Sequence, residues 1–283
     1  MKLVSFSAGD GRVRPGALLE DGDRIADLSA AGYADSLAVI AAGARTIEKA
    51  GADAGSHPSY RLDQVRLHAP IANPPRIFAI GLNYRDHAAE SKMALPPVPV
   101  VFFKLHTSII GPGETIVLPK ATAQPDYEAE LAFVIGKGGY RIPASAWREH
   151  VYGFTIANDV SARDVQFATS QWSLAKSFNT FCPLGPAIVT TDEIADPHKL
   201  AISLTIDGET LQSSNTRELV FGVPELVEYI SSIAPLAPGD IVSTGTPGGV
   251  GLGRTPKRWL KAGETVTVSV EGLGSLSNPV AAE

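Results

Sequence analysis

The sequence predicts a fold that is mainly β or α+β. Short apolar segments of strand length recur along the chain, whereas apolar residues at helical spacing are confined to a few segments. The 27 glycines and 21 prolines among 283 residues indicate many turns between the strands. At this length, and with 44% apolar residues, one large domain with a small appendage fits better than two equal domains.

Residues 1–70 are expected to form the small N-terminal domain and residues 71–283 the larger catalytic domain. The segment Asn73-Pro74-Pro75 indicates the boundary, because proline cannot occupy the interior of a central strand. The N-terminal elements expected are a strand over Lys2–Ser7, a hairpin of Gly16–Leu19 and Arg24–Leu28 around Glu20-Asp21-Gly22-Asp23, a helix from Ser36 to Ala50, and a loop over Gly51–Tyr60.

The larger domain is expected to consist mainly of strands. Helical spacing is found over Tyr84–Lys92 and Val223–Ile233, and the proline-rich stretch Met93–Pro99 predicts irregular structure. The expected strands are Ile77–Leu82, Val100–Leu105, Glu114–Leu118, Glu128–Ile135, Tyr152–Asn158, Ile202–Ile206, Glu209–Gln212, Asp240–Ser243 and Thr265–Val270.

Composition and charge argue against several classes of protein. The formal net charge of −6 argues against non-specific binding of nucleic acid, which needs a basic face. The one cysteine, Cys182, rules out an intramolecular disulfide, and with no base nearby in the sequence it is expected to be buried and structural. The N-terminus lacks the apolar run of a signal peptide, and no apolar stretch reaches the roughly 18 residues that suggest a membrane span. We therefore expect a soluble cytoplasmic protein without nucleic-acid or membrane partners.

Glu128 and Glu130 carry the main chemical signal. In a strand over Glu128–Ile135, alternate side chains share a face, so both carboxylates project beside Ala132 and Val134 from a mostly apolar strand. Like charges this close repel one another, and burial adds to the cost. A hard divalent cation, which prefers oxygen ligands, would relieve both penalties. The alternative is a solvated strand face that carries two surface glutamates.

Asp159 is the candidate for a third ligand. It ends the apolar run Gly153–Asn158, and an acid at the end of a strand is well placed to complete a cation site. This requires the two strands to be neighbours, which the sequence does not establish. The alternative is an aspartate that forms a turn.

His87 and Glu90 are the candidate general base and its partner. In a helix over Tyr84–Lys92 the two residues are three apart and lie on one face. A carboxylate beside imidazole orients the ring and makes it a better base, which suits the activation of water. The segment could act as a lid because the proline-rich stretch follows it. The alternative is an ordinary exposed pair on a helix.

Two lysines and a glycine-rich loop are candidates for binding an anionic substrate. Lys176 and Lys104 are cations in weakly charged or apolar surroundings, with surface lysines as the alternative. The loop Thr244–Gly251 lacks the Gly-Lys-Ser/Thr ending of a phosphate-binding loop, which argues against nucleotide binding. Its backbone amides and Thr246 could instead reach a small carboxylate, or the loop could be a plain tight turn.

Taken in order, these segments resemble the fumarylacetoacetate hydrolase family, in the branch with a short N-terminal extension. The resemblance covers about residues 71–275, and the ordered set is more specific than any single piece. The matching segments are residues 80–90, 126–131, 158–166, 175–178 and 244–247.

The resemblance implies the family's mixed β-sandwich roll, a homodimer and a site for Mg²⁺ or Mn²⁺. The implied roles are metal binding for Glu128, Glu130 and Asp159, catalysis for His87, Glu90 and Lys176, and substrate binding or support of the site for Gln166, Thr246 and Arg163.

The expected function is hydrolysis of a carbon–carbon bond in a small diketo or 2-keto acid, such as an acylpyruvate. Water deprotonated by His87 would attack the distal carbonyl, Lys176 would stabilise the alkoxide, and the leaving carbon would become an enolate held by the metal. Oxaloacetate decarboxylase and keto–enol tautomerase are alternatives, because their reactions pass through the same enolate. A more distant alternative is a non-catalytic carboxylate-binding protein, which would not need the base His87.

Overall fold

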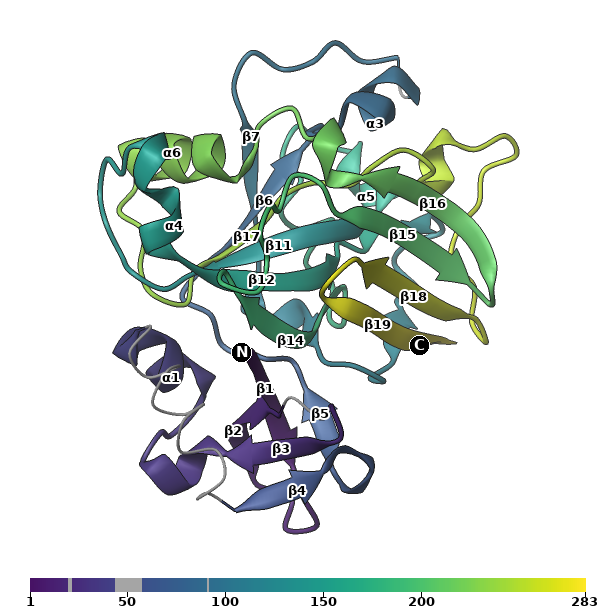
Figure 1. Ribbon diagram of the computed structural model, residues 1–283. Coiled ribbons are helices and arrows are strands. Elements are labelled where there is room, and N and C mark those ends of the chain that lie inside the picture. Colours follow the sequence, from purple (N-terminus) through teal and green to yellow (C-terminus); the bar gives the residue numbers. More distant parts are fainter. Residues whose placement is uncertain (20–21, 44–57, 91) are drawn as a thin grey trace.

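A large mixed sheet extends through the molecule from the N-terminal strands to the far edge of the larger domain (Figure 1). The computed structural model describes residues 1–19, 22–43, 58–90 and 92–283. Within them this sheet has 12 strands. Its path is β4 (Ser59–Arg61), β3 (Arg24–Asp27), β2 (Val13–Leu18), β1 (Lys2–Ser7), β14 (Cys182–Thr190), β12 (Val151–Asn158), β11 (Ala129–Ile135), β17 (Ile241–Ser243), β6 (Ile77–Gly81) and β7 (Val100–Lys104), while β5 (Arg66–His68) pairs with β1 and β8 (Ile109–Ile110) with β14.

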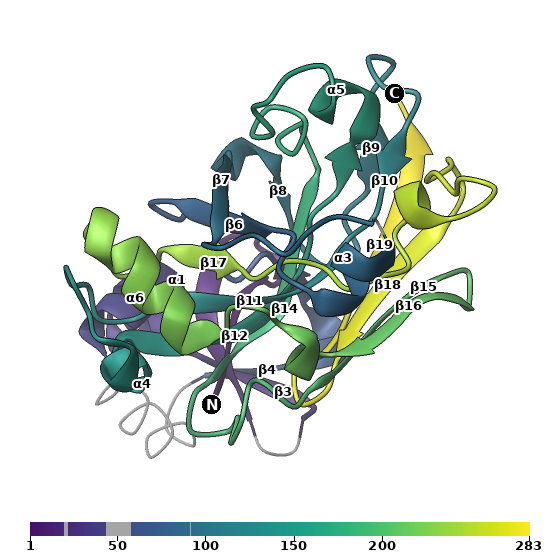
Figure 2. The ribbon, with the colours of Figure 1, turned by 90° about the horizontal axis from the view of Figure 1, so that it is seen from above.

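Two smaller sheets complete the β structure of the described residues. The five-stranded sheet packs against the large sheet as a second layer, seen edge-on in Figure 2. Its order is β16 (Glu209–Asn215), β15 (Ala201–Ile206), β18 (Thr265–Val270), β19 (Gly274–Ala282) and β9 (Ile116–Leu118), and a two-stranded sheet joins β10 (Pro125–Asp126) to β13 (Ser161–Ala162).

The helices are short and lie around the sheets. The longest of those described, α6, presents Leu226, Val227 and Ile230 to the main core, as its helical spacing predicts. The α-helices are α1 (Ser36–Ala42), α3 (Arg85–Glu90), α4 (Trp147–His150), α5 (Arg163–Gln166) and α6 (Val223–Ile233), and the 3₁₀ turns are η1 (Leu28–Ala31), η2 (Leu62–Gln64), η3 (His106–Ser108), η4 (Ala144–Ala146), η5 (Thr216–Glu218) and η6 (Gly251–Gly253).

Strand β11 lies between two hydrophobic clusters because its side chains alternate between the faces of the sheet. Leu131 and Phe133 join the core between the two layers, whereas Ala132 and Val134 pack toward α1 and the N-terminal strand β1. Every residue of β11 is buried. The strand predicted over Glu128–Ile135 begins one residue later, so Glu128 precedes β11, while Glu130, Ala132 and Val134 occupy alternate positions in it as predicted. Both glutamates are buried, so the alternative of a solvated face is wrong.

Most of the predicted strands and helices are present, with shifts at their ends. The helix predicted from Ser36 to Ala50 begins at Ser36, but α1 ends at Ala42, where Gly43 has a φ of 78°. Residues 44–57, together with 20–21 and 91, lie outside the described residues, as do the predictions that fall on them. The loop predicted over Gly51–Tyr60 is wrong at its end, since β4 begins at Ser59 and pairs with β3.

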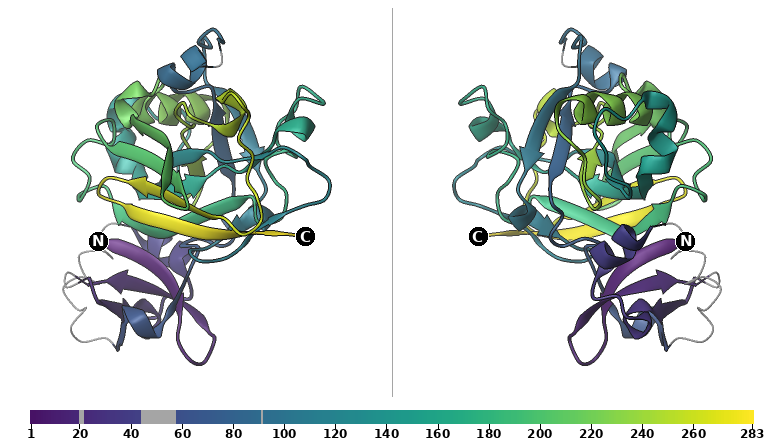
Figure 3. Two further views of the ribbon diagram at one scale, coloured as in Figure 1. Left: turned by 90° about the vertical axis from the view of Figure 1, so that its right-hand side faces the viewer. Right: turned by 90° about the vertical axis from the view of Figure 1, so that its left-hand side faces the viewer.

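Strands β14 and β19 were not predicted from the sequence. β14 contains Pro183, Gly185 and Pro186, and proline and glycine normally argue against a central strand. It is nevertheless flanked by β1 and β12, with a register irregularity between Phe154 and Ile156 of β12. Because β1 pairs with β14, the N-terminal strands continue the sheet of the larger domain (Figure 3). The division at residue 70 stays a prediction.

Candidate active site

Three buried carboxylates meet where β11 and β12 lie side by side. The antiparallel pairing brings Asp159, which directly follows β12, next to the start of β11, and its N–H donates to the Glu128 carbonyl at 2.9 Å. One carboxylate oxygen from each of Glu128, Glu130 and Asp159 lies within 4.8 Å of the others. The three residues are at most 4% exposed. The neighbouring strands that a three-acid site requires are therefore present.

Two of these carboxylates are held by cations. The Lys176 ammonium donates to Glu128 Oε2 at 2.6 Å and to Asp159 Oδ2 at 2.8 Å. Arg163 donates to Glu128 Oε1 at 2.6 Å, and Lys104 to Asp159 Oδ1 at 2.6 Å. Burial would raise the pKa of Glu128, but Lys176 and Arg163 lower it to about 2. Burial disfavours the charge of Lys176, yet Asp159 and Glu128 hold its pKa above the ordinary value, so it remains an ammonium.

Glu130 has no cationic partner in this cluster. Its Oε2 accepts hydrogen bonds from the Ser243 hydroxyl at 2.5 Å and the Gly245 N–H at 3.0 Å. Burial and the carboxylates of Asp159 and Glu128 raise its pKa well above the ordinary value. A bound cation would therefore stabilise the negative charge of the Glu130 carboxylate.

The charges of the cluster show whether a divalent ion would fit. If every group were ionised, the four buried carboxylates would outnumber the three buried cations by one, and among the described residues Glu130 is the acid of this cluster without an ion-pair partner. The carboxylates are Asp126, Glu128, Glu130 and Asp159, and the cations are Lys104, Arg163 and Lys176. Every donor to a cation here would be a carboxylate oxygen, the type that Mg²⁺ and Mn²⁺ prefer, and each such oxygen has lone pairs beyond those used by Lys176 and Arg163. The residues fit a hard divalent ion.

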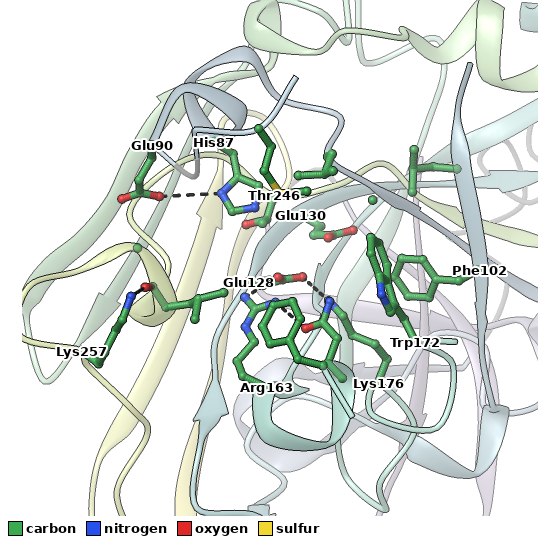
Figure 4. Close-up of a pocket in the computed structure, with 18 residues that line it drawn as sticks. His87, Glu90, Phe102, Glu128, Glu130, Arg163, Trp172, Lys176, Thr246 and Lys257 are labelled. Atoms are coloured by element: carbon green, nitrogen blue, oxygen red, sulfur yellow. Dashed lines mark hydrogen bonds and ion pairs between the residues drawn. The ribbon is translucent and has the colours of Figure 1, made fainter. Parts of the chain in front are cut away.

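His87 and Glu90 lie beside one another at the mouth of the site, on α3 (Figure 4). His87 Nδ1 is 3.7 Å from Glu90 Oε2, which is longer than a hydrogen bond. Burial opposes the charge of Glu90, but the His87 ring and the Gly249 N–H hold its pKa below the ordinary value. Both side chains line the cavity. His87 is buried and Glu90 is exposed, so only one member of the pair fits the alternative of an ordinary exposed pair.

A cavity of about 350 Å³ connects these groups. It is large enough for a small organic acid. Phe102 and Trp172 form an apolar wall on one side, with their ring centroids 5.7 Å apart. The residues around the cavity are Ile80, Gly81, Leu82, His87, Glu90, Met93, Phe102, Glu128, Glu130, Arg163, Gln166, Phe167, Trp172, Lys176, Thr246, Leu252, Gly253 and Lys257.

Of the remaining predicted site residues, Gln166 and Thr246 line the cavity and Lys104 does not. Gln166 and Thr246 line the cavity, and each is held by a hydrogen bond, from Arg163 Nη1 at 2.9 Å and from Gln212 Nε2 at 2.8 Å respectively. Lys104 lies behind Asp159, where its ammonium donates to that carboxylate and to the Lys176 carbonyl, and it does not line the cavity. Its position suits the orientation of Asp159 better than contact with a substrate.

Cys182 is buried at 2% exposure, as predicted. Burial raises the pKa of its thiol to about 11, despite the nearby cation of Lys104. A thiol of this kind is a poor nucleophile near neutral pH. The structural interpretation of this cysteine therefore holds.

Asp126 is a site residue that sequence reasoning did not single out. Its carboxylate accepts from Arg163 Nε at 2.8 Å and from the N–H groups of Gly251 and Leu252 at 2.7 and 3.0 Å. It thereby connects the arginine beside Glu128 to the glycine-rich loop. The aspartate lies in the same short segment as the predicted ligands, but its partners are 37 and 125 positions away, so local sequence has no signal for them.

Comparison with known proteins identifies the family. The family model described as Fumarylacetoacetate (FAA) hydrolase C-terminal matches residues 76–281. The chain belongs to this family. The fold and the resemblance predicted from the sequence are thus confirmed.

Relatives carry the names of several related enzymes. The mitochondrial oxaloacetate tautomerase fahd2 of Xenopus laevis is 43% identical over 99% of this chain and 90% of its own length. The structure of 5-carboxymethyl-2-hydroxymuconate delta-isomerase from Mycobacterium smegmatis has a TM-score of 0.81 at 35% identity and covers 100% of both chains. Maleylpyruvate hydrolase from Sphingobium sp. SYK-6, in complex with manganese(II) and pyruvate, has a TM-score of 0.85 at 28% identity and covers 100% of this chain and 99% of its own.

Within the described ranges, no helix has both the length and the apolar character needed to cross a membrane.

Proposed function

We propose that the protein is a divalent-metal-dependent enzyme that interconverts the keto and enol forms of a small 2-keto dicarboxylic acid of the oxaloacetate type. The observation that carries the proposal is the buried three-acid cluster, of which Glu128 and Glu130 line a small cavity together with His87 and Lys176. The identity of 43% with an oxaloacetate tautomerase over 99% of the chain supports this choice among the family's reactions.

Glu128, Glu130 and Asp159 are the residues that would hold Mg²⁺ or Mn²⁺. When bound, such an ion supplies Lewis acidity toward a 2-keto oxygen and so makes the neighbouring C–H groups more acidic. The manganese and pyruvate bound to the maleylpyruvate hydrolase relative support a divalent ion together with a 2-keto acid.

His87 moves the proton in this proposal. Its ring takes a proton from C3 of the keto form and returns one to the oxygen of the enolate, and in the reverse direction it protonates C3. The Glu90 carboxylate, which lies on the Nδ1 side of the His87 ring, orients that ring. Lys176, which remains protonated, stabilises the negative charge that develops on oxygen, while Gln166 and Thr246 hold the substrate in place.

Hydrolysis of a carbon–carbon bond is the second candidate. The pairing of His87 with Glu90 at the cavity mouth suits the activation of water, and a maleylpyruvate hydrolase shares the fold at 28% identity. Decarboxylation of oxaloacetate would use the same enolate. Acylpyruvates and oxaloacetate, assayed side by side, separate these reactions by their products.

The test is the conversion of enol to keto oxaloacetate, followed by the ultraviolet absorbance of the enol. We expect a clear acceleration over the uncatalysed rate with Mg²⁺ or Mn²⁺, and its loss with excess chelator. Exchange of the C3 hydrogens with D₂O, followed by NMR, measures the same proton transfer independently. No acceleration with any divalent ion, alongside turnover of an acylpyruvate, would replace the first candidate by the second.

Three further features stay proposals. The preference between Mg²⁺ and Mn²⁺ and the homodimer rest on the family resemblance. The cytoplasmic location is the third, and the Xenopus relative carries the word mitochondrial in its name.

A further inference from the structure

Among the residues that the structure describes, Lys257 is the exposed cation that lines the cavity. It lies on the loop that follows η6, across the cavity from Phe102 and Trp172 (Figure 4). Its ammonium donates to the backbone carbonyl of Leu252. Among residues 1–19, 22–43, 58–90 and 92–283, no carboxylate forms an ion pair with it.

The other cations of the cavity are already engaged. Arg163 is held by Asp126 and Glu128, and Lys176 bridges Glu128 and Asp159. An anionic group that reached either of them would compete with a buried carboxylate. Lys257 needs to give up only a backbone carbonyl to bind an anion, so the cost of engaging it is smaller.

Other basic residues of the same loop have structural contacts. Arg254 donates through Nε to the Gly249 carbonyl at 3.2 Å, and Arg258 Nη2 donates to Glu264 at 2.7 Å. Arg254 also donates to the Leu211 carbonyl. Lys257 differs from both because it lines the cavity and its ammonium contacts a backbone carbonyl, with no charged partner in the described part of the chain.

The base of the loop is fixed, which gives Lys257 a defined position. The Asp126 carboxylate accepts from the N–H groups of Gly251 and Leu252, and the Leu260 N–H donates to the Pro125 carbonyl at 2.9 Å. A cation on an anchored loop loses less freedom on binding than one on a free loop.

We infer that Lys257 binds the carboxylate of the substrate that is distal to the 2-keto group, and so selects dicarboxylic over monocarboxylic 2-keto acids. The inference rests on the proposed function for the identity of the reaction. The binding of a distal carboxylate by Lys257 does not depend on that function. The rings of Phe102 and Trp172 carry no charge, and the cation beside Phe102 is Lys176, which Glu128 and Asp159 already hold. Lys257 is therefore the cavity cation that is open to the distal carboxylate.

The kinetic test compares oxaloacetate with its 4-ethyl ester, which keeps the 2-keto carboxylate and the C3 hydrogens but has a neutral distal end. In Lys257→Ala we expect KM for oxaloacetate to rise about tenfold to a hundredfold with kcat within about threefold, and the ester to change by less than about threefold. Lys257→Arg should retain most of the selectivity. Lys261→Ala removes an exposed lysine outside the cavity and should change KM and kcat for neither substrate.

A binding test separates this inference from the proposed reaction. Malate and lactate cannot undergo keto–enol conversion, and they differ in the distal carboxylate. Calorimetric titration of the Mn²⁺-loaded protein should show tighter binding of malate than of lactate, and Lys257→Ala should remove that difference. If wild type fails to turn over oxaloacetate but this difference is present and depends on Lys257, the proposed reaction is wrong and the inference holds.

Two results would overturn the inference. One is equal loss on oxaloacetate and its ester in Lys257→Ala, which would indicate a structural role. The other is a wild-type protein that binds malate no better than lactate, or that keeps its preference for malate without Lys257.

Discussion

Glu130 differs from Glu128 and Asp159 because it forms no ion pair with a cation in the described ranges, while burial and those two carboxylates oppose its charge. Glu130→Gln keeps the shape and the acceptor oxygen for Ser243 and Gly245 but removes the charge. We expect affinity for Mn²⁺ to fall by at least about a hundredfold. Substitution of a residue that only supports a metal ligand lowers metal affinity by up to about a hundredfold, and substitution of a ligand itself should lower it at least as much. Calorimetry with Mn²⁺ measures this change.

The same substitution has an opposite effect on the metal-free protein. The raised pKa of Glu130 favours its neutral form when no ion is bound, and glutamine is neutral too, so the metal-free variant should be at least as stable as wild type by thermal unfolding. A variant that lost metal affinity only because it had unfolded would contradict this account.

His87 and Glu90 can be tested as a pair. His87→Ala should lower kcat for proton transfer by about a hundredfold to ten-thousandfold, the usual contribution of general acid–base catalysis, with Mn²⁺ affinity unchanged. Glu90→Gln should have a smaller effect, because it removes the orientation of the ring and keeps the base. If His87→Ala lowered metal affinity as strongly as it lowered kcat, the ring would act on the ion rather than on the proton.

At the scale of elements, the glycine-rich loop is the piece that joins the others. Asp86 and Glu90 of α3 accept from the N–H groups of Gly248 and Gly249, and Asp126 accepts from Gly251. Helix α3, which carries the candidate base His87, and Asp126, which binds Arg163, are therefore hydrogen-bonded to the same loop. Movement of that loop would displace groups on both sides of the cavity.

Gly251→Ala is the test of this connection. A Cβ at position 251 would lie 1.9 Å from the Arg258 carbonyl oxygen and 2.6 Å from Asp126 Oδ1, so the backbone must shift. We expect a loss of about 1–3 kcal/mol in the free energy of unfolding, as for other overpacked sites, and a clear fall in kcat/KM. Chemical denaturation and initial rates measure the two effects.

Gly9→Ala is the matched control, because a Cβ there meets nothing within 4 Å. It should leave activity unchanged. A Gly251→Ala variant with wild-type stability and activity would show that the loop can move without consequence.

At the scale of the whole molecule, the N-terminal strands and the catalytic sheet are one structure. Strand β1 pairs with β14, and Leu3, Val39 and Ile40 share a hydrophobic cluster with Val134 and Ile241. Burial of this interface links folding of the first 70 residues to that of the rest.

Leu3→Ala should therefore lower the stability of the entire chain. Leu3 has no exposed surface, so we expect a loss of about 2–5 kcal/mol in the free energy of unfolding, with one cooperative transition in calorimetry. Val13→Ala, at a position 50% exposed, should change stability by less than about 0.5 kcal/mol. Two separate transitions, of which only the first shifts in Leu3→Ala, would favour an independent N-terminal domain.

The amount that could be predicted from sequence depended on how local each signal was. Strand alternation placed Glu130 on the face of Ala132 and Val134, and helical spacing paired His87 with Glu90, because both patterns follow from backbone geometry within a few residues. The strand β14 was missed, since its prolines and glycine oppose strand structure locally and only its neighbours on both sides hold it in the sheet.

Sequence alone was sufficient to find the three acids, the histidine and its partner, and the family to which they belong, since these depend on residue type and short spacing. Only the tertiary structure decided that Asp159 lies beside Glu128, that Lys104 stands behind Asp159, and that Asp126 anchors the glycine-rich loop. The same holds for Lys257, which lines the cavity and has no ion-pair partner among the described residues. These relations join residues dozens to more than a hundred positions apart. Their energy comes from burial and charge pairing that exist only after the chain has folded.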